Sequence, residues 1–175
     1  MASRRFLVVV SGSKIYLVAN PLRSDGRNRT KDSFATLRHL YLDFDIDREA
    51  RLTSLRSSDA VPTPTAILST SLGKYQILWR IYTFTFERQE STLKLLAIAF
   101  RGDPVCIDCN RVFRLPGFWN CTYDPSYPIT VKYPCDSTSN PASNPGDFRL
   151  DIPAADALPL PHAIPSRQHP GKNTN

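Results

Sequence analysis

The chain has 175 residues, of which 41% are hydrophobic and 22% are charged, a composition typical of one globular domain. No segment approaches the roughly 18–20 apolar residues of a membrane span, so we expect no membrane partner and a cytoplasmic location. The formal net charge of +6 falls entirely within residues 1–31, where seven basic residues stand against one acidic residue. Such a segment suits a polyanionic partner such as nucleic acid, although a solvated loop would have the same composition.

Seven segments rich in β-branched or aromatic residues are predicted to be strands, each bounded by Gly, Pro, Ser or Asn. The first, FLVVV, follows two arginines and imitates a signal peptide, but it is shorter than the roughly 7–15 residues of a signal peptide's apolar region. We interpret it as a strand that begins close to the start of the chain, so the domain should be short at its N-terminal end. The predicted strands span residues 6–10, 14–20, 39–45, 66–70, 75–84, 111–115 and 128–133.

Helices are predicted between the strands, at residues 30–37, 47–58 and 87–100, and the last has apolar residues at helical spacing. Residues 66–70 and 75–84 form a predicted hairpin through SLGK. The irregular alternation predicts an α+β fold with a mostly antiparallel sheet and packed helices. We expect one domain over residues 1–150, because the proline-rich segment 151–175 has no sustained apolar period and is predicted to be a disordered tail.

The four cysteines do not have the spacing of a zinc site. Cys106 and Cys109 form one CxxC pair, whereas Cys121 and Cys135 are widely separated. A zinc ribbon usually has two tight pairs. Disulfides are not expected without a secretion signal. We therefore predict reduced thiols, and we do not expect zinc.

The stretch RHLYLDFDID places Asp43 and Asp45 in an otherwise apolar strand. Side chains two residues apart on a strand point to the same face, so these carboxylates should project together. Two like charges that close repel each other unless a cation lies between them, and oxygen ligands favour Mg²⁺ or Mn²⁺ over zinc. The alternative is a pair of exposed acids at the end of a strand.

Two further blocks carry residues suited to phosphate chemistry. STSLGKYQILWR places a lysine in a glycine turn, and IDCNRVFRLPGFWN supplies Asp108, Arg111 and Arg114. On one strand these two arginines would face opposite ways, so we predict that the strand starts at Val112 and that Arg111 lies in the preceding turn, with Arg114 projecting toward the same site.

Taken in order, these blocks resemble the RepB-type primase domain of plasmids and mobile elements, a branch of the archaeo-eukaryotic primase superfamily. The resemblance also includes NPLRSDGRNRTKDS upstream and YDPSYPITVKYP downstream, and it covers roughly residues 14–150. It implies an RRM-like catalytic core over residues 1–150. The implied activity is that of a nucleotidyltransferase that synthesises short primers on single-stranded DNA by a two-metal mechanism.

The resemblance also implies which residues form the site. The catalytic, metal-binding acids would be Asp43, Asp45 and Asp108, holding two Mg²⁺ or Mn²⁺ ions. Where the wider superfamily often has a histidine, this chain has Gln76, whose amide can donate a hydrogen bond but cannot carry charge. The residues expected to bind nucleotide and phosphate are Ser71, Lys74, Gln76, Arg111 and Arg114.

The expected partners are single-stranded DNA, nucleoside triphosphates and a replicative helicase encoded separately. Arg27, Arg29 and Lys31 are predicted to contact DNA phosphates. Two alternatives stay open at this point. One is a catalytically inactive or truncated nucleic-acid-binding replication protein on the same fold, and the other is a metal-dependent nuclease that uses the same acids.

Overall fold

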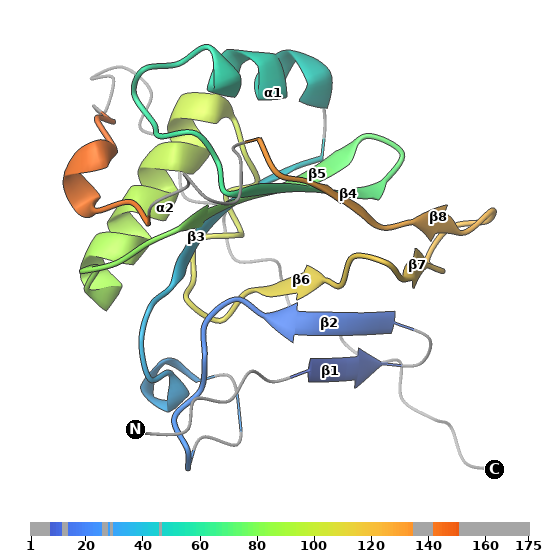
Figure 1. Ribbon diagram of the computed structural model, residues 1–175, viewed down its shortest axis with the longest axis horizontal. Coiled ribbons are helices and arrows are strands. Elements are labelled where there is room, and N and C mark those ends of the chain that lie inside the picture. The colour runs from blue at the N-terminus through green and yellow to red at the C-terminus, as the bar shows by residue number, and fades with distance from the viewer. Residues whose placement is uncertain are drawn as a thin grey trace, which may run out of the picture.

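The structure, a computed structural model, describes residues 8–11, 14–25, 28, 30–45, 47–134 and 142–150. It consists of a four-stranded sheet, a three-stranded sheet and a short hairpin, with two α-helices (Figure 1). The expected α+β fold with mostly antiparallel strands and packed helices is confirmed. The predicted tail at 151–175 lies outside the described residues.

The larger sheet is antiparallel throughout and has the strand order β3-β5-β4-β9. The hairpin between β4 and β5 is the one that the sequence predicted. Its register with β3 places Asp43 opposite Gln76. The strands are β3 (His39–Phe44), β4 (Ala66–Ser71), β5 (Lys74–Arg80) and β9 (Thr130–Lys132).

Helices α1 (Arg48–Arg56) and α2 (Phe86–Phe100) pack on one face of this sheet (Figure 1). That face is apolar because alternate residues of the strands point toward the helices. Leu40, Leu42 and Phe44 of β3 are buried there, and so are Leu93 and Leu96 of α2. None of the helices in the described ranges is long and apolar enough to cross a membrane.

The second sheet lies on the other side of the larger one (Figure 1). It has the antiparallel order β1-β2-β6 and consists of β1 (Val8–Ser11), β2 (Lys14–Val18) and β6 (Val112–Arg114). Phe113 of β6 packs edge to face against Tyr41 of β3, with ring centroids 5.4 Å apart. The face of β3 that carries Tyr41 and Asp43 is therefore covered by β6.

Two predicted elements differ from the structure, and two short elements of the structure were not predicted. Residues 30–37 form only a 3₁₀ turn, η1 (Lys31–Ser33), because Thr30 and Ser33 donate hydrogen bonds to the side chain of Asn28 and the chain then leaves the turn in an extended conformation at Phe34. The strand predicted at 75–84 ends at Arg80. The sequence did not predict the short hairpin of β7 (Trp119–Asn120) and β8 (Tyr127–Pro128), or the 3₁₀ turn η2 (Pro145–Asp147).

Gly102 allows the chain that leaves α2 to pass closely over β3. A Cβ atom at this position would lie 2.2 Å from Cδ1 of Leu42, a buried side chain, and 3.4 Å from the carbonyl oxygen of Asp43. The next residue is held in place by a hydrogen bond of 3.0 Å from the Asp103 amide to that same carbonyl. A residue without a side chain is required at position 102, because only then can the chain pass close enough to β3 to place Asp103 next to Asp43.

We predict that Gly102→Ala lowers the free energy of unfolding by about 1–3 kcal/mol, because the added methyl group overpacks the contact with Leu42. Urea denaturation followed by circular dichroism measures this change. Gly146→Ala is the matched control, because its Cβ would meet only the side-chain oxygen of Asn144, at 3.2 Å. Equal stability of the two variants would show that α2 does not need this close approach.

Candidate active site

The polar face of β3 contains an ion pair at the junction of the two sheets. The Asp43 carboxylate is 2.8 Å from Nη2 of Arg111, and both side chains are largely covered, with 12% and 26% of their surface exposed. Burial by itself lowers the pKa of Arg111. The hydrogen bond and charge of Asp43, together with smaller electrostatic effects of Cys106 and Asp103, outweigh burial, so the pKa of Arg111 is raised. The guanidinium therefore stays charged and compensates the buried carboxylate.

A second ion pair lies two residues further along the same face. The Asp45 carboxylate is 2.9 Å from Nζ of Lys74, and both side chains are more exposed than those of the first pair, at 50% and 39%. Hydrogen bonding to Asp45 raises the pKa of Lys74, with a smaller contribution from the hydroxyl of Tyr123. Asp43 and Asp45 thus share one face, as predicted, and each faces a cation from another segment.

Gln76 links the first pair to β6. Its amide nitrogen donates long hydrogen bonds of 3.5 and 3.4 Å to the two oxygens of Asp43. Its amide oxygen accepts a bond of 3.3 Å from the backbone amide of Arg114. Both ends of the side chain are engaged within the protein, so Gln76 orients the carboxylate.

Asp103 is an acid near Asp43 that the sequence analysis did not single out. The sulfur of Cys106 lies 3.1 Å from Oδ2 of Asp103 and 3.5 Å from Oδ2 of Asp43, so its single S–H is within hydrogen-bond distance of both carboxylates. Burial and the charge of Asp43 raise the pKa of this thiol, which keeps it protonated. The only feature of the sequence that points to the closeness of Asp103 and Asp43 is Gly102, the glycine before Asp103.

Asp108, the acid that the sequence predicted, lies further along the same loop. Its carboxylate accepts a hydrogen bond of 3.3 Å from the amide of Asn110, within its own turn. It also lies near Tyr41, whose pKa is raised by burial first and by the charge of Asp108 second. In the described part of the chain, the hydrogen bonds that reach the carboxylate of Asp43 come from Gln76, Cys106 and Arg111.

The two arginines of the third block have different surroundings. The strand starts at Val112, so Arg111 belongs to the preceding turn, as predicted. Arg114 lies over the ring of Tyr16, 4.9 Å from its centroid, and donates a bond of 3.1 Å from Nη2 to Thr122. Its Nη1 is buried and has no hydrogen-bond partner among the described residues.

The other predicted contact residues lie in three places. Ser71 is buried at the end of β4 and pairs with Lys74 across the turn. Lys31 forms an ion pair of 2.8 Å with Glu90 of α2 and lies over the ring of Phe86. Arg27 and Arg29 lie outside the described residues.

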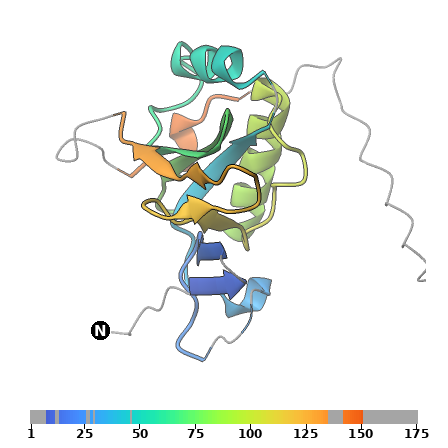
Figure 2. The same ribbon diagram turned by 90° about the vertical axis from the view of Figure 1, so that its right-hand side faces the viewer.

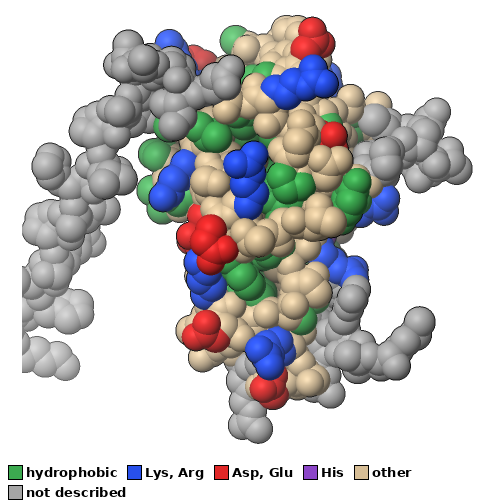
Figure 3. Space-filling model, turned by 90° about the vertical axis from the view of Figure 1, so that its left-hand side faces the viewer, with side chains coloured by type: hydrophobic (Ala, Val, Ile, Leu, Met, Phe, Trp, Pro, Cys, Tyr) green, Lys and Arg blue, Asp and Glu red, His purple; other side chains and the backbone are tan. Residues whose placement is uncertain are grey.

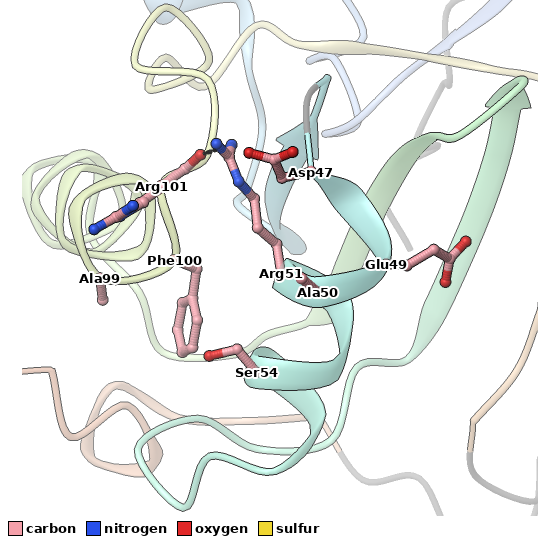
Figure 4. A pocket seen from close by; sticks show the side chains of 8 residues that line it. All are labelled: Asp47, Glu49, Ala50, Arg51, Ser54, Ala99, Phe100 and Arg101. Carbon is pink, nitrogen blue, oxygen red and sulfur yellow. Dashed lines mark hydrogen bonds between the residues drawn. The ribbon is translucent and has the colours of Figure 1, made fainter.

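A separate pocket of about 700 Å³ lies between α1 and the end of α2 (Figure 4). Arg51 points across it and donates a hydrogen bond to the carbonyl oxygen of Arg101. Asp47, the first residue of the helix predicted at 47–58, occupies the N-cap position of α1 in a left-handed conformation without a side-chain capping bond. Neither Asp43 nor Lys74 lines this pocket, so it is distinct from the carboxylate face.

The donor chemistry of the carboxylate face fits a hard divalent cation. Asp43, Asp45 and Asp103 offer carboxylate oxygens, which are the ligands of Mg²⁺ and Mn²⁺ in proteins. In the present arrangement Arg111 and Lys74 engage the first two. Within the described residues, no group of three or more His, Cys, Asp or Glu side chains is arranged so that it could hold a metal ion.

The fold is that of archaeo-eukaryotic primases. The structure is similar to the AEP domain of the cyanophage S-2L primase-polymerase (PrimPol), with a TM-score of 0.60 and 13% sequence identity, over 84% of this chain and 87% of that one. Two weaker matches, each at 19% identity over 68% of this chain, are the primase RepB′ (TM-score 0.48, 37% of its chain) and the catalytic domain of RepB′ in complex with initiator DNA (TM-score 0.49, 55% of its chain).

The sequence defines the family more narrowly. Residues 4–131 match the model of the RepB DNA-primase N-terminal domain, and the chain belongs to that family. It is thus a DNA primase domain of the nucleotidyltransferase class, as its sequence motifs implied. No curated protein matches the chain.

We predict that Arg111→Ala lowers the free energy of unfolding by about 2–3 kcal/mol, because it leaves the buried Asp43 carboxylate without its cation. Lys74→Ala is the matched control and should cost less than about 1 kcal/mol, since its pair with Asp45 is exposed. Chemical denaturation in metal-free buffer measures both. The loss of unfolding free energy caused by Arg111→Ala should disappear when Asp43 is also changed to Asn. An equal loss in that double variant would contradict the Asp43–Arg111 pairing.

Proposed function

We propose that the chain synthesises short primers on single-stranded DNA, in the replication of a plasmid or other mobile element in the cytoplasm. One observation carries the proposal. Asp43 lies on the polar face of a core strand, Asp45 follows directly after that strand, and a cation from another segment faces each of them. Paired acids beside paired cations form a site for triphosphate chemistry, which depends mainly on positioning and charge neutralisation.

Two Mg²⁺ or Mn²⁺ ions are the cofactor that we propose, with Asp43 and Asp45 as residues that would hold them. Bound there, such ions would activate the primer hydroxyl and neutralise the leaving pyrophosphate. Gln76 contributes by fixing the Asp43 carboxylate from the opposite strand. Cys106, a protonated thiol, orients the same carboxylate from the loop after α2.

The basic side chains of the site would bind the phosphates of the incoming nucleoside triphosphate. Lys74 is flexible and half-exposed, whereas Arg111 offers a planar guanidinium suited to bidentate phosphate contacts. Arg114 adds a second guanidinium, which now donates from Nη2 to Thr122 and whose buried Nη1 could reach a phosphate oxygen only after the side chain turns. Ser71 lies next to Lys74 in the same turn and supports its backbone.

The third acid of the site is open to a direct test. The resemblance to the RepB-type primase domain implies Asp108, which precedes Arg111 and Arg114 in the third block. The positions of the side chains favour Asp103, because its carboxylate and that of Asp43 both lie within hydrogen-bond distance of the Cys106 sulfur. We propose Asp103 as the third acid and assign Asp108 to the folding of its own turn.

The partners that we propose are the single-stranded template, nucleoside triphosphates and a helicase encoded separately. Support for DNA comes from the family to which the chain belongs. The basic residues Arg27, Arg29 and Lys31 keep their predicted role in contacting template phosphates. Binding through phosphates should weaken as salt increases, because it releases counterions.

We predict that Asp43→Asn, Asp45→Asn and Asp103→Asn each reduce primer synthesis by roughly 100-fold or more, since each removes several kcal/mol of charge stabilisation. Asp108→Asn should retain most of the activity. The assay follows labelled nucleotides on single-stranded DNA with Mg²⁺ or Mn²⁺. Asp47→Asn, an exposed acid close by in the chain, is the control and should leave synthesis unchanged.

Other outcomes separate the alternatives. Loss of activity in Asp108→Asn but not in Asp103→Asn would restore Asp108 as the third acid. Tight DNA binding without incorporation in either metal would contradict the enzyme and identify an inactive binding protein. Metal-dependent cleavage of the DNA without primer synthesis would identify a nuclease.

A further inference from the structure

An exposed aromatic cluster lies at the hairpin β7–β8, which projects to one side of the molecule (Figures 1 and 2). Trp119 has 58% of its surface exposed, and Phe118 and Tyr123 have 43% and 45%. Eight large hydrophobic side chains are exposed in the described residues, and three of them fall within this six-residue stretch. Single exposed aromatics are ordinary, but three of them within six residues make this hairpin a candidate binding surface.

The hairpin that carries these rings is firmly attached to the larger sheet. The buried side chain of Asn120 donates a hydrogen bond of 2.6 Å to the carbonyl oxygen of Thr70, at the bulge of β4. The hydroxyl of Tyr127 forms a bond of 2.9 Å with Ser69 of the same strand. Trp119, next to Asn120 on a strand, faces away from this attachment and toward solvent. The aromatic surface is therefore held rigidly before any ligand binds.

Two cations of the candidate active site adjoin the hairpin. Lys74 lies close enough to Tyr123 for its hydroxyl to affect the lysine's protonation. Arg114 donates a hydrogen bond to Thr122, whose own amide bonds to Asn120. The aromatic surface is thus continuous with the basic side of the carboxylate site. On the side of the molecule where α2 lies, by contrast, acidic and basic side chains are interspersed (Figure 3).

We propose that the segment Phe118–Tyr123 is a stacking platform for bases of single-stranded DNA, with Trp119 as its principal ring. Aromatic rings beside a basic groove are the usual means of binding single strands without sequence preference, because every base has a face that can stack. A protein partner would not require the adjacent cations. The platform rests on the proposed function, for it would hold the template next to the acids.

The test uses the full chain, a thymidine decamer and an abasic decamer of equal charge. Trp79 is buried, so the difference between wild-type and Trp119→Phe fluorescence reports on Trp119 alone. We expect the thymidine strand to quench that signal. Trp119→Ala should weaken binding of this strand about tenfold, while Trp119→Phe recovers most of it. Binding of the abasic strand and the salt dependence should not change, since no phosphate contact is lost.

Tyr82→Ala is the matched control, because Tyr82 is an exposed aromatic outside the hairpin, at 47% against 58% for Trp119. It should bind both strands as the wild type does. Trp119→Ala with wild-type affinity for thymidine, or with an equal loss on both strands, would overturn the platform and leave the proposed primase standing. A wild-type chain that binds neither strand would overturn both.

Discussion

The Asp43 carboxylate lies in a nearly closed space between two sheets, and the arrangement of the site follows from that placement. A buried carboxylate needs a cation or several hydrogen-bond donors to be tolerated there. Arg111 supplies the charge, and Gln76 and Cys106 supply donors. Each comes from a different segment of the chain, so one acidic side chain ties β5, β6 and the loop after α2 to the strand β3.

The fold serves this site through asymmetry between the faces of the larger sheet. One face of β3 packs its leucines against the helices, and the opposite face turns Asp43 toward Arg111, in the turn before β6, while Asp45 follows at the exposed end of the strand. Packing on the helix face stabilises the fold, and this stability offsets the free-energy cost of burying charged side chains on the polar face. Gly102 connects the two, because its lack of a side chain lets the chain cross from α2 to the polar side next to Asp43.

The sequence predicted those parts of the site that depend on local periodicity. Residues Asp43 and Asp45 share a face because strand side chains alternate, and Arg111 had to lie in a turn because Arg114 occupies the strand. The glycine turn at SLGK was predicted to join two strands as a hairpin and to carry Lys74. These expectations rest on contacts within one or two elements, and the structure agrees with them.

The parts that the sequence did not predict depend on contacts between distant segments. Asp103 reaches Asp43 only because α2 ends against Leu42, which no local pattern reveals. The strands of the hairpin β7–β8 have two residues each, which is too short to show a period in the sequence. The hairpin is held by the hydrogen bond from the Asn120 side chain to a backbone carbonyl of β4. The helix expected at 30–37 is replaced by a turn because side chains of Thr30 and Ser33 bond to Asn28.

The central claim is that the carboxylates of Asp43 and Asp45 hold divalent cations while Arg111 and Lys74 turn to the triphosphate. A crystal of the wild-type chain grown with Mn²⁺ and a non-hydrolysable nucleoside triphosphate tests it through an anomalous difference map at the manganese edge. The account predicts manganese peaks against both carboxylates and a phosphate group against Arg111 or Lys74. Manganese bound elsewhere, with nucleotide present and the Asp43–Arg111 pair intact, would contradict it.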